Sequence, residues 1–136
     1  MIDIAIHQHE GPVALKSVAE RQVLSESYLE QLISSLRKSG LVIGHRGAQG
    51  GYQLARESAE IKIGDILRVL EGPIAPVKCV SEEVTETFCC NSEKCATKFF
   101  WERLRDSIVN VIDSTSLADL VATSEKLNQP VPMYYI

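Results

Sequence analysis

The stretch from Ser25 to Leu54 constrains the fold of this chain most strongly. Ser25 stands where the N-cap of a helix is expected, and Gly40 stands where the left-handed residue after its C-terminus is expected. Two short apolar runs, residues 41–43 and 52–54, then bracket a glycine-rich tip. The helix between the caps has an apolar face with the spacing i, i+3, i+4 and i+7, formed by Leu29, Leu32, Ile33 and Leu36. A helix followed by such a hairpin predicts a winged helix-turn-helix.

The other face of this predicted helix is polar, and the hairpin tip is basic. No Asp or Glu occurs from Gln31 to Arg56, although the whole chain has a net charge of −4. Polar and basic side chains can contact base edges and phosphates, and glycines let a backbone approach another molecule closely. We therefore expect a DNA-binding surface that includes Ser27, Glu30, Gln31, Arg37, Lys38, Arg46 and Gln49.

Two shorter helices are expected before this stretch, at residues 1–9 and 14–22, with a turn at residues 23–24. This is the three-helix plan in which the last helix enters the major groove of DNA. His7 and His9 lie two residues apart, hence on different helix faces, and are poor joint metal ligands. Residues 1–56 are assigned as the DNA-binding region, in a fold that is mainly α with a small β-wing.

The remaining residues, 57–136, are acidic, with eight Lys or Arg against thirteen Asp or Glu. Helices are expected at residues 61–71, 95–114 and 115–127, and the apolar tail 130–136 is expected to pack on the body. The long helix has a heptad-like seam of Trp101, Leu104, Ile108 and Val111. The seam fits either the chain's own core or a second copy. We favour a homodimer, because helix-turn-helix proteins commonly bind two half-sites by twofold symmetry.

All four cysteines lie in an irregular stretch, residues 72–95, with the spacing C-x9-C-x5-C and Cys90 beside Cys89. No pair has the C-x2-C spacing of a zinc ribbon or a ferredoxin. The spacing alone leaves an iron–sulfur cluster, a zinc site and a redox switch open. No apolar run reaches the ~20 residues of a membrane span, and Asp3 replaces the basic start of a signal peptide. We expect a cytoplasmic protein, not a membrane protein, with reduced thiols.

Four segments together resemble the Rrf-type family of winged-helix bacterial repressors, in its iron–sulfur-cluster regulator (IscR-like) branch. They are LSESYLEQLISSLRKSGLV, RGAQGGYQLAR, GDILRVLEGPIAPVKCV and the cysteine-containing loop before Trp101. The resemblance implies a homodimer that binds palindromic double-stranded promoter DNA and carries a cluster-binding loop at about 72–95, followed by dimerisation helices. Ser27, Glu30 and Arg46 match the family's base-contacting positions, flanked by Tyr28 and Gln31.

Cys79, Cys89 and Cys95 match the family's three cluster thiolates, which implies an iron–sulfur cluster of the 2Fe–2S type. The family's fourth ligand is often a His three residues after the last Cys, and Lys98 stands there in this chain. A protonated Lys has no lone pair for iron. The fourth ligand is left open between Cys90, a loop carboxylate and a group outside this segment. Adjacent residues seldom both reach one small cluster, which favours Cys90 as a bystander.

The predicted function is a DNA-binding repressor that senses iron–sulfur cluster status, and not an enzyme. The alternative is a CymR-like repressor of cysteine metabolism, which shares the tail pattern, lacks a cluster and reports through a protein partner. A third class, a thiol enzyme with Cys89 or Cys90 as nucleophile, is disfavoured. All three histidines precede the loop, and no Cys–His–Asx pattern is evident.

Overall fold

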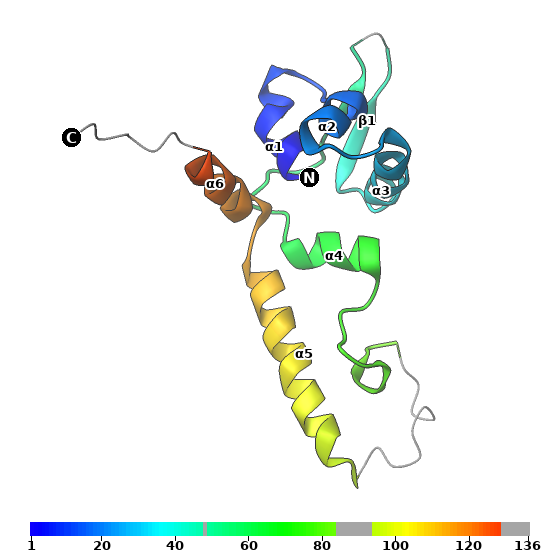
Figure 1. The fold of residues 1–136 in the computed structure, drawn as a ribbon, viewed down its shortest axis with the longest axis vertical. Helices are drawn as coiled ribbons and strands as arrows, with labels where there is room; N and C mark the ends of the chain where they lie inside the picture. The colour runs from blue at the N-terminus through cyan, green and yellow to red at the C-terminus, as the bar shows by residue number, and fades with distance from the viewer. Residues whose placement is uncertain (48, 84–93, 129–136) are drawn as a thin grey trace, which may run out of the picture.

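The computed structural model describes residues 1–47, 49–83 and 94–128, which form six α-helices, two short 3₁₀ helices and one two-stranded antiparallel sheet (Figure 1). A fold that is mainly α with a small β-wing is therefore confirmed. The elements in chain order are α1 (Ile2–His7), η1 (Gln8–Glu10), α2 (Leu15–Gln22), α3 (Glu26–Lys38), β1 (Val42–His45), β2 (Gly51–Leu54), α4 (Ile63–Glu71), η2 (Lys78–Val80), α5 (Ala96–Ser114) and α6 (Leu117–Leu127).

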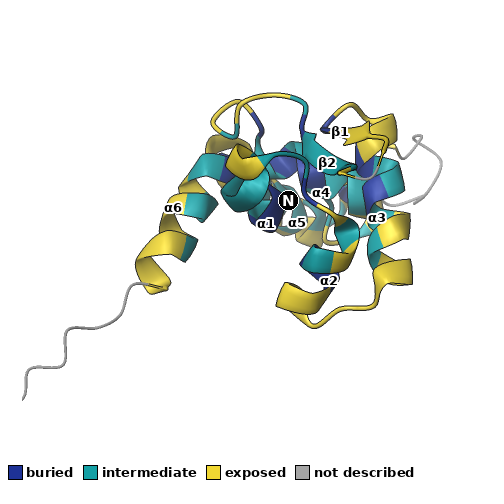
Figure 2. Cartoon of the chain, turned by 90° about the horizontal axis from the view of Figure 1, so that it is seen from above, coloured by how far each residue is buried: buried dark blue, intermediate teal, exposed yellow. Residues whose placement is uncertain are grey.

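The first three helices and the sheet form a head, from which α5 extends as a long arm (Figure 1). Apolar residues from α1, α2, α3, the sheet and α4 meet at the centre of the head, where the buried positions gather (Figure 2). Ile61 and Leu117, which flank the excursion of the chain through α4 and α5, are the most deeply buried, at 0% and 1% exposure. The hydrophobic core therefore belongs to the head and not to the arm.

The expected helix caps and hairpin are present. The Ser25 hydroxyl accepts a hydrogen bond from the Tyr28 N–H at 3.3 Å, so Ser25 is the N-cap of α3. Gly40 follows the helix with φ +75°, a left-handed conformation that favours glycine. The strands pair from Val42↔Leu54 to His45↔Gly51. The first predicted helix is shorter than expected: α1 ends at His7 and continues as η1 up to Gly11, whose φ is +125°.

The chain leaves and re-enters the head at one point, which we call the neck. There Lys62 and Ser116 form an antiparallel bridge. The Leu117 N–H donates to the Ile61 carbonyl at 2.8 Å, and the Ile63 N–H donates to the Thr115 carbonyl at 3.0 Å. Beyond the neck, α4 packs against both α3 and α5, so it lies between the head and the arm.

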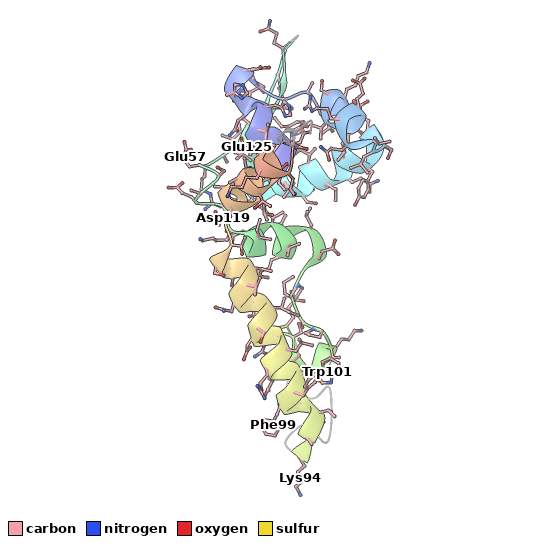
Figure 3. The ribbon with its side chains drawn as sticks, turned by 60° about the vertical axis from the view of Figure 1, so that its left-hand side comes forward. Glu57, Lys94, Phe99, Trp101, Asp119 and Glu125 are labelled. Atoms are coloured by element: carbon pink, nitrogen blue, oxygen red, sulfur yellow. The ribbon has the colours of Figure 1, made fainter. Side chains whose placement is uncertain are left out.

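The arm buries little of its own surface: Ile112 is its only buried residue. Leu104 and Val111 of the predicted seam are 36% and 61% exposed, whereas Trp101 and Ile108 are half-buried by their own chain. Trp101 and Phe99 point to opposite sides of α5 (Figure 3). The seam therefore divides into an inward half and an outward half, and the outward half gains Phe100, which is 60% exposed.

Two predictions concern residues outside those that the structure describes: the packing of the tail 130–136, and the positions of Cys89 and Cys90. Within the described ranges, no helix is both long enough and apolar enough to cross a membrane.

Candidate nucleic-acid interface and cysteine segment

The polar face of α3 is directed outward, as the helical pattern predicts. Ile33 and Leu36 are 5% and 4% exposed and fix the helix on the core. The predicted contact residues in the first two turns are exposed, and so are the two basic residues of the last turn: Ser27, Tyr28, Glu30, Gln31, Arg37 and Lys38. The last pair also complements the negative C-terminal end of the helix dipole, which is a structural role independent of any ligand.

The wing brings its two predicted contact residues, Arg46 and Gln49, to an exposed tip that projects from the head, while strand β1 packs against α3 (Figure 1). The tip is a tight turn in which the Gly50 N–H donates to the Gly47 carbonyl at 2.9 Å. Gly47 has φ +118°, and a Cβ on Gly50 would lie 2.5 Å from the His45 carbonyl oxygen. Gly47 therefore favours glycine through its backbone conformation, and Gly50 needs glycine because its neighbours leave no room for a side chain. The absence of side chains lets another molecule approach this backbone closely.

The wing is anchored to the head at its base. Val13 and Tyr52 exchange two backbone hydrogen bonds of 2.9 Å each, so an isolated antiparallel bridge joins the segment before α2 to β2. The Gln8 side-chain oxygen accepts a hydrogen bond from the Leu54 N–H at 2.9 Å. The wing and α3 are thus held by the same core, which fixes the tip relative to the helix.

A buried carboxylate that the sequence analysis did not identify holds α2. Asp3 is 7% exposed and accepts hydrogen bonds from Arg21 Nη2 at 2.6 Å, from Arg21 Nε at 3.0 Å and from Gln22 Nε2 at 3.0 Å. Burial acts to raise the pKa of Asp3, but these hydrogen bonds and the positive charge of Arg21 outweigh it and lower the pKa below its ordinary value. The available signal was an acid inside the apolar run Met1–Ile6.

The hydrogen-bonded group of Asp3, Arg21 and Gln22, here called the Asp3 clamp, lies directly before the turn into α3. The next residue, Val23, has φ +54° and is 90% exposed. A β-branched residue rarely adopts this left-handed conformation. The hydrogen bonds of Asp3 to the last turn of α2 therefore fix the start of a strained turn whose other end is the N-cap of α3.

Two of the three predicted cluster ligands lie in the described residues, and both are free thiols. Cys95 is the N-cap residue of α5. A hydrogen bond with the Thr97 hydroxyl at 3.1 Å, together with backbone contacts in the first turn, lowers the pKa of the Cys95 thiol. Cys79 lies in η2, half-buried.

Cys79 and Cys95 lie on two different elements, η2 and the start of the arm. The arm residue that holds η2 is Arg105, whose Nη1 donates to the Val80 carbonyl at 2.8 Å. Arg105 stands ten residues after Cys95, about 15 Å along the helix axis. Within the described ranges, no group of three or more His, Cys, Asp or Glu side chains is placed to hold a metal ion. Lys98, at the position of the family's frequent fourth ligand, lies 3.9 Å from Glu102.

His7 and His9 are used locally, as the spacing suggested. Nδ1 of His7 donates to the Asp3 carbonyl and Nδ1 of His9 donates to the Ile6 carbonyl, each at 2.8 Å. Both hydrogen bonds are local, because each joins a histidine ring to a carbonyl group of α1.

A second ion pair absent from the sequence analysis joins α4 to α5. Arg68 donates to both carboxylate oxygens of Asp113, at 2.7 Å through Nη1 and 2.9 Å through Nη2. The hydrogen bonds from Arg68 lower the pKa of Asp113 below its ordinary value. Arg68 also lines a pocket of about 190 Å³ together with Glu82, Glu83 and Val109.

Comparison with known proteins agrees with this geometry. The family model of the Rrf2 iron-dependent transcriptional regulators matches residues 1–123. The chain is 46% identical to the HTH-type transcriptional regulator CymR of Bacillus subtilis, over 100% of this chain and 91% of that protein. It is 40% identical to the HTH-type transcriptional regulator IscR of Erwinia tasmaniensis over 93% of this chain and 74% of that protein.

The solved structure of T. potens IscR superposes with a TM-score of 0.76 and 50% identity, over 98% of this chain and 87% of that one. These relatives are transcriptional regulators, which excludes the thiol-enzyme interpretation. The chain belongs to the Rrf2 family of transcriptional regulators.

Proposed function

We propose that this regulator is a homodimer that reads palindromic promoter DNA with α3 and the wing, and that its DNA binding responds to an iron–sulfur cluster held by Cys79, Cys89 and Cys95. The observation that carries the DNA-binding part is the joint exposure of the polar face of α3 and the glycine-rich wing tip on one core. In helix-turn-helix proteins, residues near the start of the recognition helix contact base edges. Ser27, Tyr28, Glu30 and Gln31 have that place here.

Each proposed contact residue has a distinct chemical task. Arg46 can form two parallel hydrogen bonds to guanine or to a phosphate, and Gln31 and Gln49 can donate and accept on base edges. Glu30 can accept a hydrogen bond from the cytosine amino group and repels phosphate. It would therefore contribute to the sequence selectivity of DNA binding rather than to its affinity. Arg37 and Lys38, at the far end of α3, would neutralise phosphates.

The outward half of the arm supports a homodimer. Phe100, Leu104 and Val111 follow one face of α5 and are exposed in the single chain. An apolar stripe on a helix that buries only Ile112 within its own chain is the kind of surface that a second copy covers. Twofold pairing through this stripe would present two copies of α3 to two half-sites.

The thiols that the structure describes suit iron in their chemistry. Iron–sulfur clusters take thiolate ligands, and the lowered pKa of Cys95 favours its thiolate form. Such a cluster would supply a group whose presence and oxidation state depend on cellular iron and oxidants. In this proposal the chain holds Cys79 on η2 and Cys95 at the N-cap of α5, so that a shared cluster would tie the two elements to each other.

Two observations favour a second candidate, the cluster-free CymR-like regulator. The likeness to CymR of Bacillus subtilis extends over the whole chain, and Lys98 replaces the histidine that often completes the cluster. In this candidate the DNA-binding surface and the homodimer are unchanged, and the signal comes from a protein partner.

Anaerobic purification and reconstitution with iron and sulfide separate the two candidates. The cluster candidate predicts visible absorption and bound iron that are lost in Cys79→Ala, Cys89→Ala and Cys95→Ala and kept in Cys90→Ala. The Cys90 variant is the matched control, because it removes a thiol from the same segment. A colourless wild-type protein that still binds promoter DNA would establish the cluster-free candidate.

A further inference from the structure

We infer that the Arg68–Asp113 ion pair is the contact through which residues 78–83, here called the cysteine turn, act on the DNA-reading head. Arg68 and Asp113 are then positioning residues for regulated DNA binding. The inference rests on the proposed function, because it assigns the route by which a change at Cys79 reaches α3.

The cysteine turn is held on α5 by a hydrogen bond, and it shares a pocket with Arg68 of α4. Val80 is 3% exposed, and its carbonyl accepts the 2.8 Å hydrogen bond from Arg105 of the arm. At the other end of the turn, Glu82 and Glu83 line the pocket that also contains Arg68. A displacement of Cys79 that carries Glu82 and Glu83 with it would therefore change the lining of the pocket that contains the Arg68 guanidinium.

Arg68 is well placed to pass such a change to the head. It belongs to α4, which packs against α3, and it lies two residues from Ile66, which is buried in the head core. Its partner Asp113 follows Ile112, the buried residue of the arm. Each member of the pair thus lies within two residues of a position that is fixed by packing, so a change in the pair would alter how α4 packs between head and arm.

The sequence of α4 accommodates this pair at a cost in helix propensity. Gly64 lies in the first turn of α4 and is buried. A Cβ at this position would overlap the Asp113 carboxylate and the Arg68 guanidinium. Glycine is less favourable than alanine in a helix by about 1 kcal/mol. Its presence here lets the carboxylate lie directly against the α4 backbone.

A second carboxylate, that of Glu82, lines the same pocket as Arg68. An Arg side chain has five N–H donors, and the two hydrogen bonds to Asp113 leave donors for a second carboxylate. Glu82 is near enough for its charge to act on Arg68. Among the described residues, the carboxylate that pairs with Arg68 is that of Asp113, at 2.7 Å, and Glu82 adds a more distant negative charge that would move with the turn.

Hydrogen–deuterium exchange on the full-length protein, without cluster or DNA, tests the coupling directly. Asp113→Asn removes the charge, and Gly64→Ala displaces the pair by steric overlap without removing any charge. Both are expected to speed exchange in α4 and in the cysteine turn together. Glu125→Gln, an exposed carboxylate on α6 (Figure 3), is the control and should leave both segments unchanged. Faster exchange in α4 alone would show that the pair holds α4 on α5 without any coupling to the cysteine turn, and would overturn the inference.

The second readout is the ratio of the promoter dissociation constants of the cluster-loaded and cluster-free protein, on a duplex selected by the wild type from a random pool. Loss of the pair should bring this ratio about fivefold closer to one, and the swap of Arg68→Asp with Asp113→Arg should restore part of it. An unchanged ratio in both Asp113→Asn and Gly64→Ala would overturn the inference. A wild-type ratio of one would instead overturn the proposed cluster sensing, while the exchange experiment still decides the coupling.

Discussion

Two exposed side chains of opposite charge, Arg46 on the wing and Glu30 on α3, make the proposed reading surface testable residue by residue. Arg46→Ala should weaken binding to a specific duplex by about 1–3 kcal/mol if the guanidinium forms a bidentate base contact. Glu30→Ala should instead narrow the difference between specific and scrambled duplexes, because removing the carboxylate removes repulsion from phosphates. Fluorescence anisotropy at one fixed salt concentration measures both effects, with Glu125→Ala as the control. Unchanged affinities in both variants would contradict the assigned surface.

The buried Asp3 clamp leads to a prediction about stability and pH. Asp3→Asn should lower the free energy of unfolding at neutral pH by about 1–3 kcal/mol, because a neutral amide cannot accept all three hydrogen bonds from Arg21 and Gln22. Since the folded pKa of Asp3 is lowered, its contribution is full above the unfolded value of about 3.9 and is lost as pH falls through the folded value. Urea unfolding against pH should show a shallower acid limb in the variant. Glu10→Gln, an exposed neighbour, should keep the wild-type profile.

At the scale of single residues, the sequence correctly predicts which side chains are exposed where a local apolar pattern determines it. The apolar spacing that ends at Leu36 fixes which side of α3 faces inward, so the exposure of Glu30 and Gln31 follows from the sequence. The pairs Asp3–Arg21 and Arg68–Asp113 join residues that are distant in sequence. They exist only once helices pack, and a single sequence carries no periodic signal for them. The relative position of Cys79 and Cys95 likewise has no signal in the sequence, because it depends on where Arg105 holds η2 against the arm.

The wing, as an element, depends on close contact with the segment before α2. A Cβ on Gly51 would lie 2.5 Å from the Val13 carbonyl oxygen, so Gly51→Ala should separate Val13 from β2 and cost about 1–3 kcal/mol. Gly47→Ala is the matched control at the tip: it strains a φ of +118° but meets no neighbour within 4 Å. Amide protection of Val13 and Tyr52, measured by NMR, should be lost in the first variant and kept in the second. Retained protection in Gly51→Ala would mean that the base of the wing can shift without loss.

The long helix shows the limit of periodicity for a whole element. The apolar repeat correctly predicted a helix to Ser114, and the structure confirms it as α5. It did not reveal that Trp101 and Ile108 would be partly covered by their own chain, because an apolar stripe does not identify its partner. Phe100 was overlooked for a related reason: it stands beside Trp101 in sequence, outside the strict heptad positions.

At the scale of the whole molecule, the outward stripe of α5 predicts the oligomeric state. Leu104→Lys combined with Val111→Lys would place charges in the proposed twofold contact, where an unpaired buried charge is costly. Sedimentation should show a dimer for the wild type and a monomer for the double variant, with unchanged helix content by circular dichroism. Leu127→Lys, which changes an exposed residue of α6, is the control. A double variant that remains a tight dimer would place the interface elsewhere.

The neck at Lys62 and Ser116 has a consequence for how such a regulator can diversify. Because the two ends of the excursion are joined by backbone hydrogen bonds at the base of the head, segments beyond the neck can change in length at a modest entropic cost. The cysteine segment can then be lengthened, shortened or replaced while the head keeps its core. The architecture thus separates the proposed DNA-reading part, before the neck, from the proposed signal-receiving part beyond it, so that either part can change in sequence while the other keeps its structure.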